Sequence, residues 1–98
     1  MKINMTKNAD ALNVALTGRL DTSSSPELEK KLQEAIGGVA ALTFDLSALD
    51  YISSAGLRVL LSAQKVMNKQ GQMKVIHVSD VIMEIFEVTG FTDILTIE

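Results

Sequence analysis

Apolar and polar residues alternate in two short stretches near the start of the chain, residues 2–7 and 12–17. This period of two is typical of strands that bury one face. Residues 8–10 lie between the stretches and have the composition of a turn. The pattern therefore predicts two strands joined as an antiparallel hairpin.

Three later stretches have apolar residues at helical spacing. The first is expected to begin with Ser25 as its N-cap and Pro26 at its first helical position, and to end at residues 37–38, which are both glycine. The second spans residues 54–68, with Leu57, Leu60, Leu61 and Met67 on its apolar face. The third is capped by Ser79 or Asp80, carries Ile82, Ile85, Phe86 and Val88, and ends near Gly90.

Strands are predicted between and after these helices, at residues 41–46, 73–78 and 91–97, with residues 47–53 as a loop. Helical crossovers make the later strands parallel neighbours. The second and third strands alternate cleanly, which indicates a sheet with one solvent-facing side. We therefore expect one α/β domain over residues 1–98, a mixed sheet with its helices packed on one face.

The composition argues against many kinds of functional site. The chain of 98 residues has no cysteine and one histidine, His77, which argues against disulfides, thiolate metal sites and cysteine nucleophiles. A net charge of -3 gives no general attraction for nucleic acid. Phosphate-binding glycine motifs are missing, and no stretch is as long and apolar as a membrane span or signal peptide. We expect a cytoplasmic protein without cofactor, metal, nucleic-acid partner or membrane insertion.

The most unusual segment is residues 45–60, which leaves the carboxyl end of a parallel strand and enters a helix. Such edges are common binding sites in α/β sheets. Ser53 and Ser54 lie at the helix start, where a negative charge is stabilised by ~0.3–1 kcal/mol, and Ala55 and Gly56 add little bulk around their hydroxyls. A plainer interpretation is that one of the two serines only caps the helix, a contribution of ~1 kcal/mol.

Three motifs along the chain resemble those of one family. Asp-Leu-Ser at residues 45–47 is followed by Ile-Ser-Ser-Ala-Gly-Leu at residues 52–57, Leu-Thr-Gly-Arg-Leu-Asp stands at residues 16–21, and Thr-Gly-Phe at residues 89–91. Together they resemble the STAS domains, in particular the bacterial anti-sigma-factor antagonists.

The resemblance implies a switch protein and not an enzyme. Such antagonists bind an anti-sigma factor that is also a serine kinase and so release a sigma factor. The kinase phosphorylates the antagonist, and a phosphatase reverses the modification. The family's acceptor serine matches Ser54, while the aspartate before it is replaced by Ser53, which becomes the second candidate. The resemblance further implies a partner surface of Asp21, Thr22, Ser53, Ser54, Ala55, Gly56, Leu57 and Arg58.

Other interpretations remain open at this point. The chain could be a STAS subunit of a transport, lipid-trafficking or signalling scaffold complex that phosphate does not control. An enzyme with Ser54 as nucleophile would need His77 as its base, although a hydrogen-bonded structural histidine is the plainer expectation. Asp21 could equally cap its own loop, and a pair of Asp45 with Asp50 for acid–base work is speculative.

Overall fold

The four strands of the sheet follow their order in the chain, β1-β2-β3-β4, in a computed structural model that describes residues 1–98. The first pair is antiparallel and the other two pairs are parallel, which confirms the predicted hairpin and mixed sheet. The strands are β1 (Lys2–Asn8), β2 (Ala11–Leu20), β3 (Ala41–Ile52) and β4 (Gln72–Ile76). The helices are α1 (Ser25–Ala35), α2 (Ser54–Gln70), α3 (Asp80–Thr89) and a short 3-10 turn, η1 (Phe91–Asp93).

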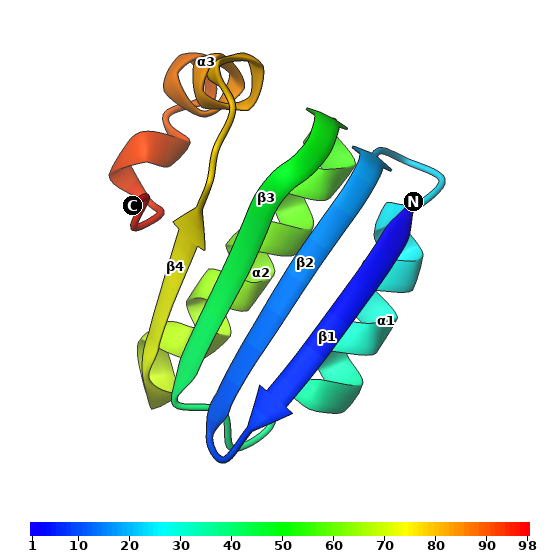
Figure 1. Cartoon of the computed structure of the whole chain (residues 1–98). Helices are drawn as coiled ribbons and strands as arrows, with labels where there is room; N and C mark the ends of the chain where they lie inside the picture. Colours follow the sequence, from blue (N-terminus) through cyan, green and yellow to red (C-terminus); the bar gives the residue numbers. More distant parts are fainter.

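Helices α1 and α2 cover one face of the sheet, and the other face is open (Figure 1). The alternation in β2 explains this, because Leu12, Val14 and Leu16 are buried under the helices while Asn13 and Thr17 are exposed. The fold class predicted from the sequence is thus confirmed. None of the helices has the length and apolar character needed to cross a membrane.

Helix α3 departs from the expectation that every helix lies on that face. It lies across the carboxyl end of the sheet, above β3 (Figure 1). Ile82 and Phe86 are fully buried and hold it there. Val88, expected on the packed face, is 78% exposed.

Strand β3 is six residues longer than the pattern predicts, so the expected loop at residues 47–53 is wrong. Its pairing with β2 shifts twice, between the pairs Ala15–Asp45 and Thr17–Ala48 and again before Arg19–Tyr51. Each shift places an extra residue in β3 and breaks the period of two. Leu46 and Leu49 are therefore both buried although they are three positions apart.

The expected final strand at residues 91–97 is also wrong. Gly90 ends α3 with a φ of 78°, a left-handed conformation that glycine adopts easily. The next residues form η1, and just after it the Leu95 N–H donates to the Phe91 carbonyl at 2.8 Å. Phe91 stacks on Phe86 with ring centroids 6.4 Å apart. Only Ile97 pairs with the sheet, through one bridge to Val75.

Candidate functional site

The carboxyl ends of β2 and β3 lie side by side and bring the two main motifs together. Leu20 and Ile52 are parallel partners at this end, and the Ser53 N–H donates to the Leu20 carbonyl at 2.9 Å. Asp21 and Ser53 therefore follow directly from adjacent strand ends. The structure thus places the predicted partner-surface residues along one edge of the domain.

The two serines at the start of α2 have different environments. Ser53 is the N-cap, with an extended backbone at φ −95° and ψ 176°, and its Oγ accepts a hydrogen bond from the Gly56 N–H at 3.4 Å. Ser54 is the first helical residue and is exposed. The capping role considered for either serine thus falls to Ser53, which leaves the Ser54 hydroxyl at the surface.

Gly56 lets α2 approach the strand ends closely. A Cβ at this position would lie 2.7 Å from Leu20 Cγ and 2.8 Å from Ile52 Cγ1, distances too short for ordinary contact. Gly56 and its neighbour Leu57 are both buried. These two members of the predicted surface therefore position the helix, and the exposed members are those that a partner can reach.

Asp21 organises the loop between β2 and α1. Its Oδ1 accepts hydrogen bonds from the N–H groups of Ser23 at 3.0 Å and Ser24 at 3.1 Å and from the Ser23 hydroxyl at 2.8 Å. The bonds from the Ser23 hydroxyl and the Ser24 N–H are the main causes that lower the pKa of Asp21 to about 2. Asp21 is therefore ionised at neutral pH and caps its own loop, as the alternative interpretation predicted.

The N-cap of α1 is Ser24, one residue before the expected Ser25. Ser24 holds that position without a side-chain cap bond, and Ser25 lies inside the helix, buried, with its hydroxyl donating to the Asp21 carbonyl at 2.5 Å. The Asp21 carbonyl also accepts the backbone N–H of Ser25 at 2.9 Å, so the turn supplies an acceptor for the first N–H of the helix.

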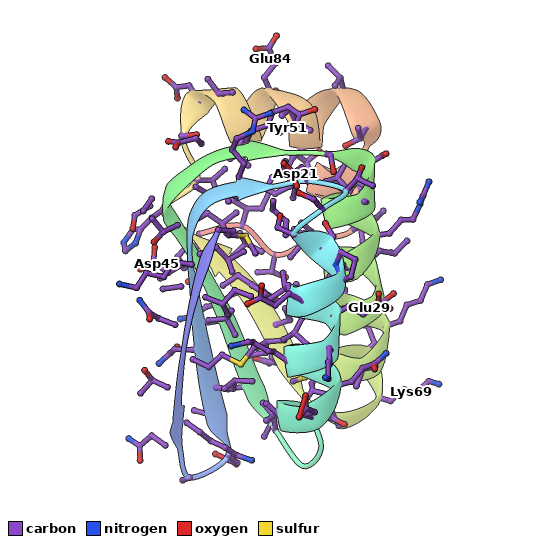
Figure 2. The ribbon with its side chains drawn as sticks, turned by 90° about the vertical axis from the view of Figure 1, so that its right-hand side faces the viewer. Asp21, Glu29, Asp45, Tyr51, Lys69 and Glu84 are labelled. Carbon is purple, nitrogen blue, oxygen red and sulfur yellow. The ribbon has the colours of Figure 1, made fainter.

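Arg19 belongs to this edge and was not anticipated from the sequence. Its guanidinium carbon lies 4.5 Å from the centre of the Tyr51 ring, and its Nε lies 3.9 Å from Asp21 Oδ2. The Arg19–Tyr51 pairing depends on the second register shift in β3, which the alternation pattern does not reveal. Tyr51 is thus held on the open side of the strand, close to Asp21 (Figure 2).

Thr22 and Arg58 lie on the helical side of the same edge. Together with Ala55 they line an open hollow of about 380 Å³ between the starts of α1 and α2. Thr22 and Arg58 are exposed and Ala55 is partly exposed. The helical side of the edge thus combines small uncharged groups with one exposed arginine, Arg58.

His77 and Asp45 form a separate pair on the open face of the sheet. His77 Nδ1 lies 3.0 Å from Asp45 Oδ1, and the histidine side chain is 62% exposed. The backbone N–H of Ser47 is the main cause that lowers the pKa of Asp45, and His77 adds to it. No group of three histidine or carboxylate side chains in residues 1–98 has the geometry to hold a metal ion.

This pair lies far from the start of α2. Asp45 pairs with Ala15 and Ile52 with Leu20, so they are five residues of β2 apart, which at about 3.3 Å per residue is roughly 16 Å. In Figure 2, Asp45 lies further from α3 than Asp21 does. His77 is therefore too far from Ser54 to act as its base. Because His77 is the only histidine of the chain, an enzyme with Ser54 as nucleophile would have no histidine base.

The sheet order, the two helices on one face and the β3–α2 junction are those of a known class of α/β domain. Residues 2–98 match the STAS domain family, and the chain belongs to that family. It is 35% identical to the antagonist BtrV of Bordetella bronchiseptica over 99% of the chain and 85% of BtrV. It is 30% identical to the anti-sigma-B factor antagonist of Bacillus subtilis, over 99% of the chain and 90% of that protein.

Solved structures agree with this fold. The anti-sigma factor antagonist SpoIIAA in its unphosphorylated form superposes with a TM-score of 0.79 at 16% identity, covering 99% of the chain and 87% of SpoIIAA. At that identity the likeness shows the fold. The family match over residues 2–98, together with the relative at 35% identity, confirms the family resemblance inferred from the three motifs.

Proposed function

We propose that this chain is a phosphorylation-controlled antagonist that binds an anti-sigma factor with serine-kinase activity and so releases a sigma factor in the cytoplasm. Ser54 is the phosphoacceptor, and a phosphatase that acts on phospho-Ser54 restores the binding form. The proposal is supported by relatives named as anti-sigma factor antagonists. The observation that carries it is the division of roles at α2, where Ser53 caps the helix and Ser54 stays exposed.

The unmodified edge suits burial by a partner. The first turn of α2 presents the side chains of Ser54 and Ala55, so a partner can approach the backbone closely and displace little bound water. Covering two small, uncharged side chains has a low desolvation cost compared with covering an ion. The exposed Arg58 and Thr22 at the rim supply a charge and a hydroxyl for recognition.

Phosphorylation changes this edge without disturbing the fold. The helix start tolerates the added anion, because its free N–H groups favour negative charge. The phosphate brings roughly −1.5 to −2 charges at neutral pH, on an edge that already carries the carboxylate of Asp21, whose pKa of about 2 keeps it ionised. A partner that covers the start of α2 must then desolvate a dianion in place of a small uncharged hydroxyl, and the complex dissociates.

Incubation with purified anti-sigma kinases and ATP, followed by mass spectrometry, tests the proposal. We expect phosphate on Ser54 in the wild type and in Ser53→Ala, and none in Ser54→Ala. Ser54→Asp is expected to bind the anti-sigma factor at least about tenfold more weakly, whereas Ser54→Ala binds like the wild type. Phosphate on Ser53 or elsewhere, or full-affinity binding by Ser54→Asp, contradicts the assignment.

A further inference from the structure

Helix α3 exposes an apolar stripe on its outer side. Val81 is 58% exposed and Val88 is 78% exposed, and the two lie seven residues, or about two turns, apart on one face. Ile85 lies between them and is half-buried. Figure 2 shows α3 crossing the end of the domain with Glu84 directed away from it. Nothing in the chain covers this stripe, although Ile82 and Phe86 anchor the opposite face of the helix.

The charged side chains on α3 and in the rest of residues 75–98, apart from His77, are all carboxylates. All nine lysines and arginines of the chain lie between Lys2 and Lys74, whereas residues 75–98 contain five carboxylates and no lysine or arginine. Three of the carboxylates, Asp80, Glu84 and Glu87, are exposed on α3. Their positions in the helix place them on one side of the Val81–Val88 stripe. The outer face of α3 is thus an apolar strip with an acidic rim.

The charge restricts what can cover this face. Two copies of α3 packed face to face would bring six carboxylates together, and an anionic lipid surface would be repelled in the same way. A protein segment with its own apolar stripe and flanking lysines or arginines would instead gain from both features. The complementary occupant is therefore a basic, amphipathic segment of a protein partner.

We propose that the outer face of α3 is a second docking surface for the anti-sigma factor and binds a basic amphipathic segment of it. This inference rests on the function proposed above. α3 packs on the end of β3, the strand that leads directly into Ser53 and Ser54, so one partner can cover both places (Figures 1 and 2). The α3 contact does not include the phosphoacceptor, so its contribution to affinity is the same before and after phosphorylation.

Binding of each purified anti-sigma factor of the same cell to the full chain, measured by calorimetry, tests the proposal. The double variant Val81→Ser/Val88→Ser is expected to lose at least about tenfold in affinity, in both the wild-type and the Ser54→Asp backgrounds. Glu84→Gln/Glu87→Gln is expected to bind more weakly and with a smaller salt dependence. Val66→Ser on α2, whose valine is 38% exposed, and Glu34→Gln on α1 are matched controls that should bind like the wild type.

The outcomes separate this proposal from the one it rests on. Unchanged affinity of both α3 double variants, with Ser54→Asp still impaired, overturns the α3 surface and leaves the proposed function intact. No binding of the wild type to any anti-sigma factor overturns both. Circular dichroism of the variants identifies misfolding, and if Val81→Ser/Val88→Ser has lost helix, the charge variant, which leaves the apolar residues in place, decides the matter.

Discussion

Helix α2 has a closely packed glycine at each end, and the two ends present very different surfaces. At its start a Cβ on Gly56 would meet the side chains of Leu20 and Ile52 at 2.7 and 2.8 Å. At its end a Cβ on Gly71 would lie 2.0 Å from the Ala40 carbonyl oxygen. Close packing therefore leaves no room for a side chain at either glycine, although only Gly56 belongs to a motif by which the family is recognised.

The polar groups distinguish the two ends. At the end of α2 they are bonded to the loop between α1 and β3: Gln70 Nε2 donates to the carbonyls of Ile36 and Val39, both at 2.7 Å, and the Gln72 N–H donates to the Ala40 carbonyl at 2.9 Å. At the start, Ser53 makes the cap bond and Ser54 remains exposed. A closely packed glycine is therefore not enough to identify a functional surface. The start of α2 differs from its end because packing leaves a polar side chain, Ser54, exposed there.

Gly71→Ala tests the packed end and has the largest expected effect. The new methyl group would overlap the Ala40 carbonyl, a backbone atom that cannot rotate away. We expect the free energy of unfolding to fall by about 3 kcal/mol or more, measured by urea denaturation.

Gly37→Ala is the matched control for this variant. A Cβ on Gly37 has no atom within 4 Å, so its unfolding free energy should stay within about 0.5 kcal/mol of the wild-type value. Equal stability of the two variants would show that the close approach at Gly71 relaxes without cost.

Gly56→Ala tests the start of α2 and should have a smaller effect on stability. The methyl group would meet the ends of two side chains, Leu20 and Ile52, which can move by changing rotamer. We expect a loss of about 1–3 kcal/mol, together with a shift of the helix start that lowers the rate of Ser54 phosphorylation. A wild-type phosphorylation rate in a folded Gly56→Ala variant would show that the position of the helix start is not critical.

Sequence patterns predicted the hairpin, the three helices and the mixed sheet because each of these depends on local periodicity. They failed where tertiary pairing alters the periodicity. The first register shift in β3 separates the buried Leu46 from Leu49 by three positions, and the second does the same for Leu49 and Ile52, so a continuous strand resembled a strand followed by a loop. At the end of the chain, Phe91 and Leu95 face the core from a helical turn, and their spacing of four fitted that turn better than the strand we expected.

The candidate site was predictable in location and less so in the role of each residue. The sequence placed Ser53 and Ser54 at the start of a helix, which the structure confirms, but it ended the strand before them six residues too early. The pairing of Leu20 with Ile52, which brings Asp21 and Ser53 together, was therefore not predicted. Which serine caps α2 depends on the backbone geometry of Ser53, and the part played by Arg19 depends on a bulge. Neither follows from residue types alone.

Ser53→Ala sharpens the distinction between the two serines. Loss of the hydrogen bond from the Gly56 N–H to Ser53 Oγ should lower the unfolding free energy by about 1 kcal/mol. Ser54→Ala should change it by less than about 0.5 kcal/mol, because the side chain is exposed. Thermal denaturation at equal protein concentration compares the two, and a greater loss for Ser54→Ala would reverse the assigned roles.

Asp21 is expected to give the smallest effect, and its pH dependence is confined to acid. Because folding lowers its pKa from 3.8 to about 2, the ionised carboxylate stabilises the folded state above pH 4, and that contribution is lost as the pH falls from 4 towards 2. The Asp21 carboxyl carbon followed by NMR should titrate with a midpoint near 2. Between pH 2 and pH 4 the stability of Asp21→Asn should depend less on pH than that of the wild type, since the titrating group is gone.

Ser23→Ala separates the causes of this shift. It removes the hydroxyl that bonds to Asp21 Oδ1 at 2.8 Å but keeps the Ser23 and Ser24 N–H donors. Since that hydroxyl is the largest cause of the low pKa, the midpoint should rise towards 3.8 without reaching it. An unchanged midpoint would assign the shift to the backbone of the loop, which would then hold Asp21 at the edge of the site whatever residue stands at position 23.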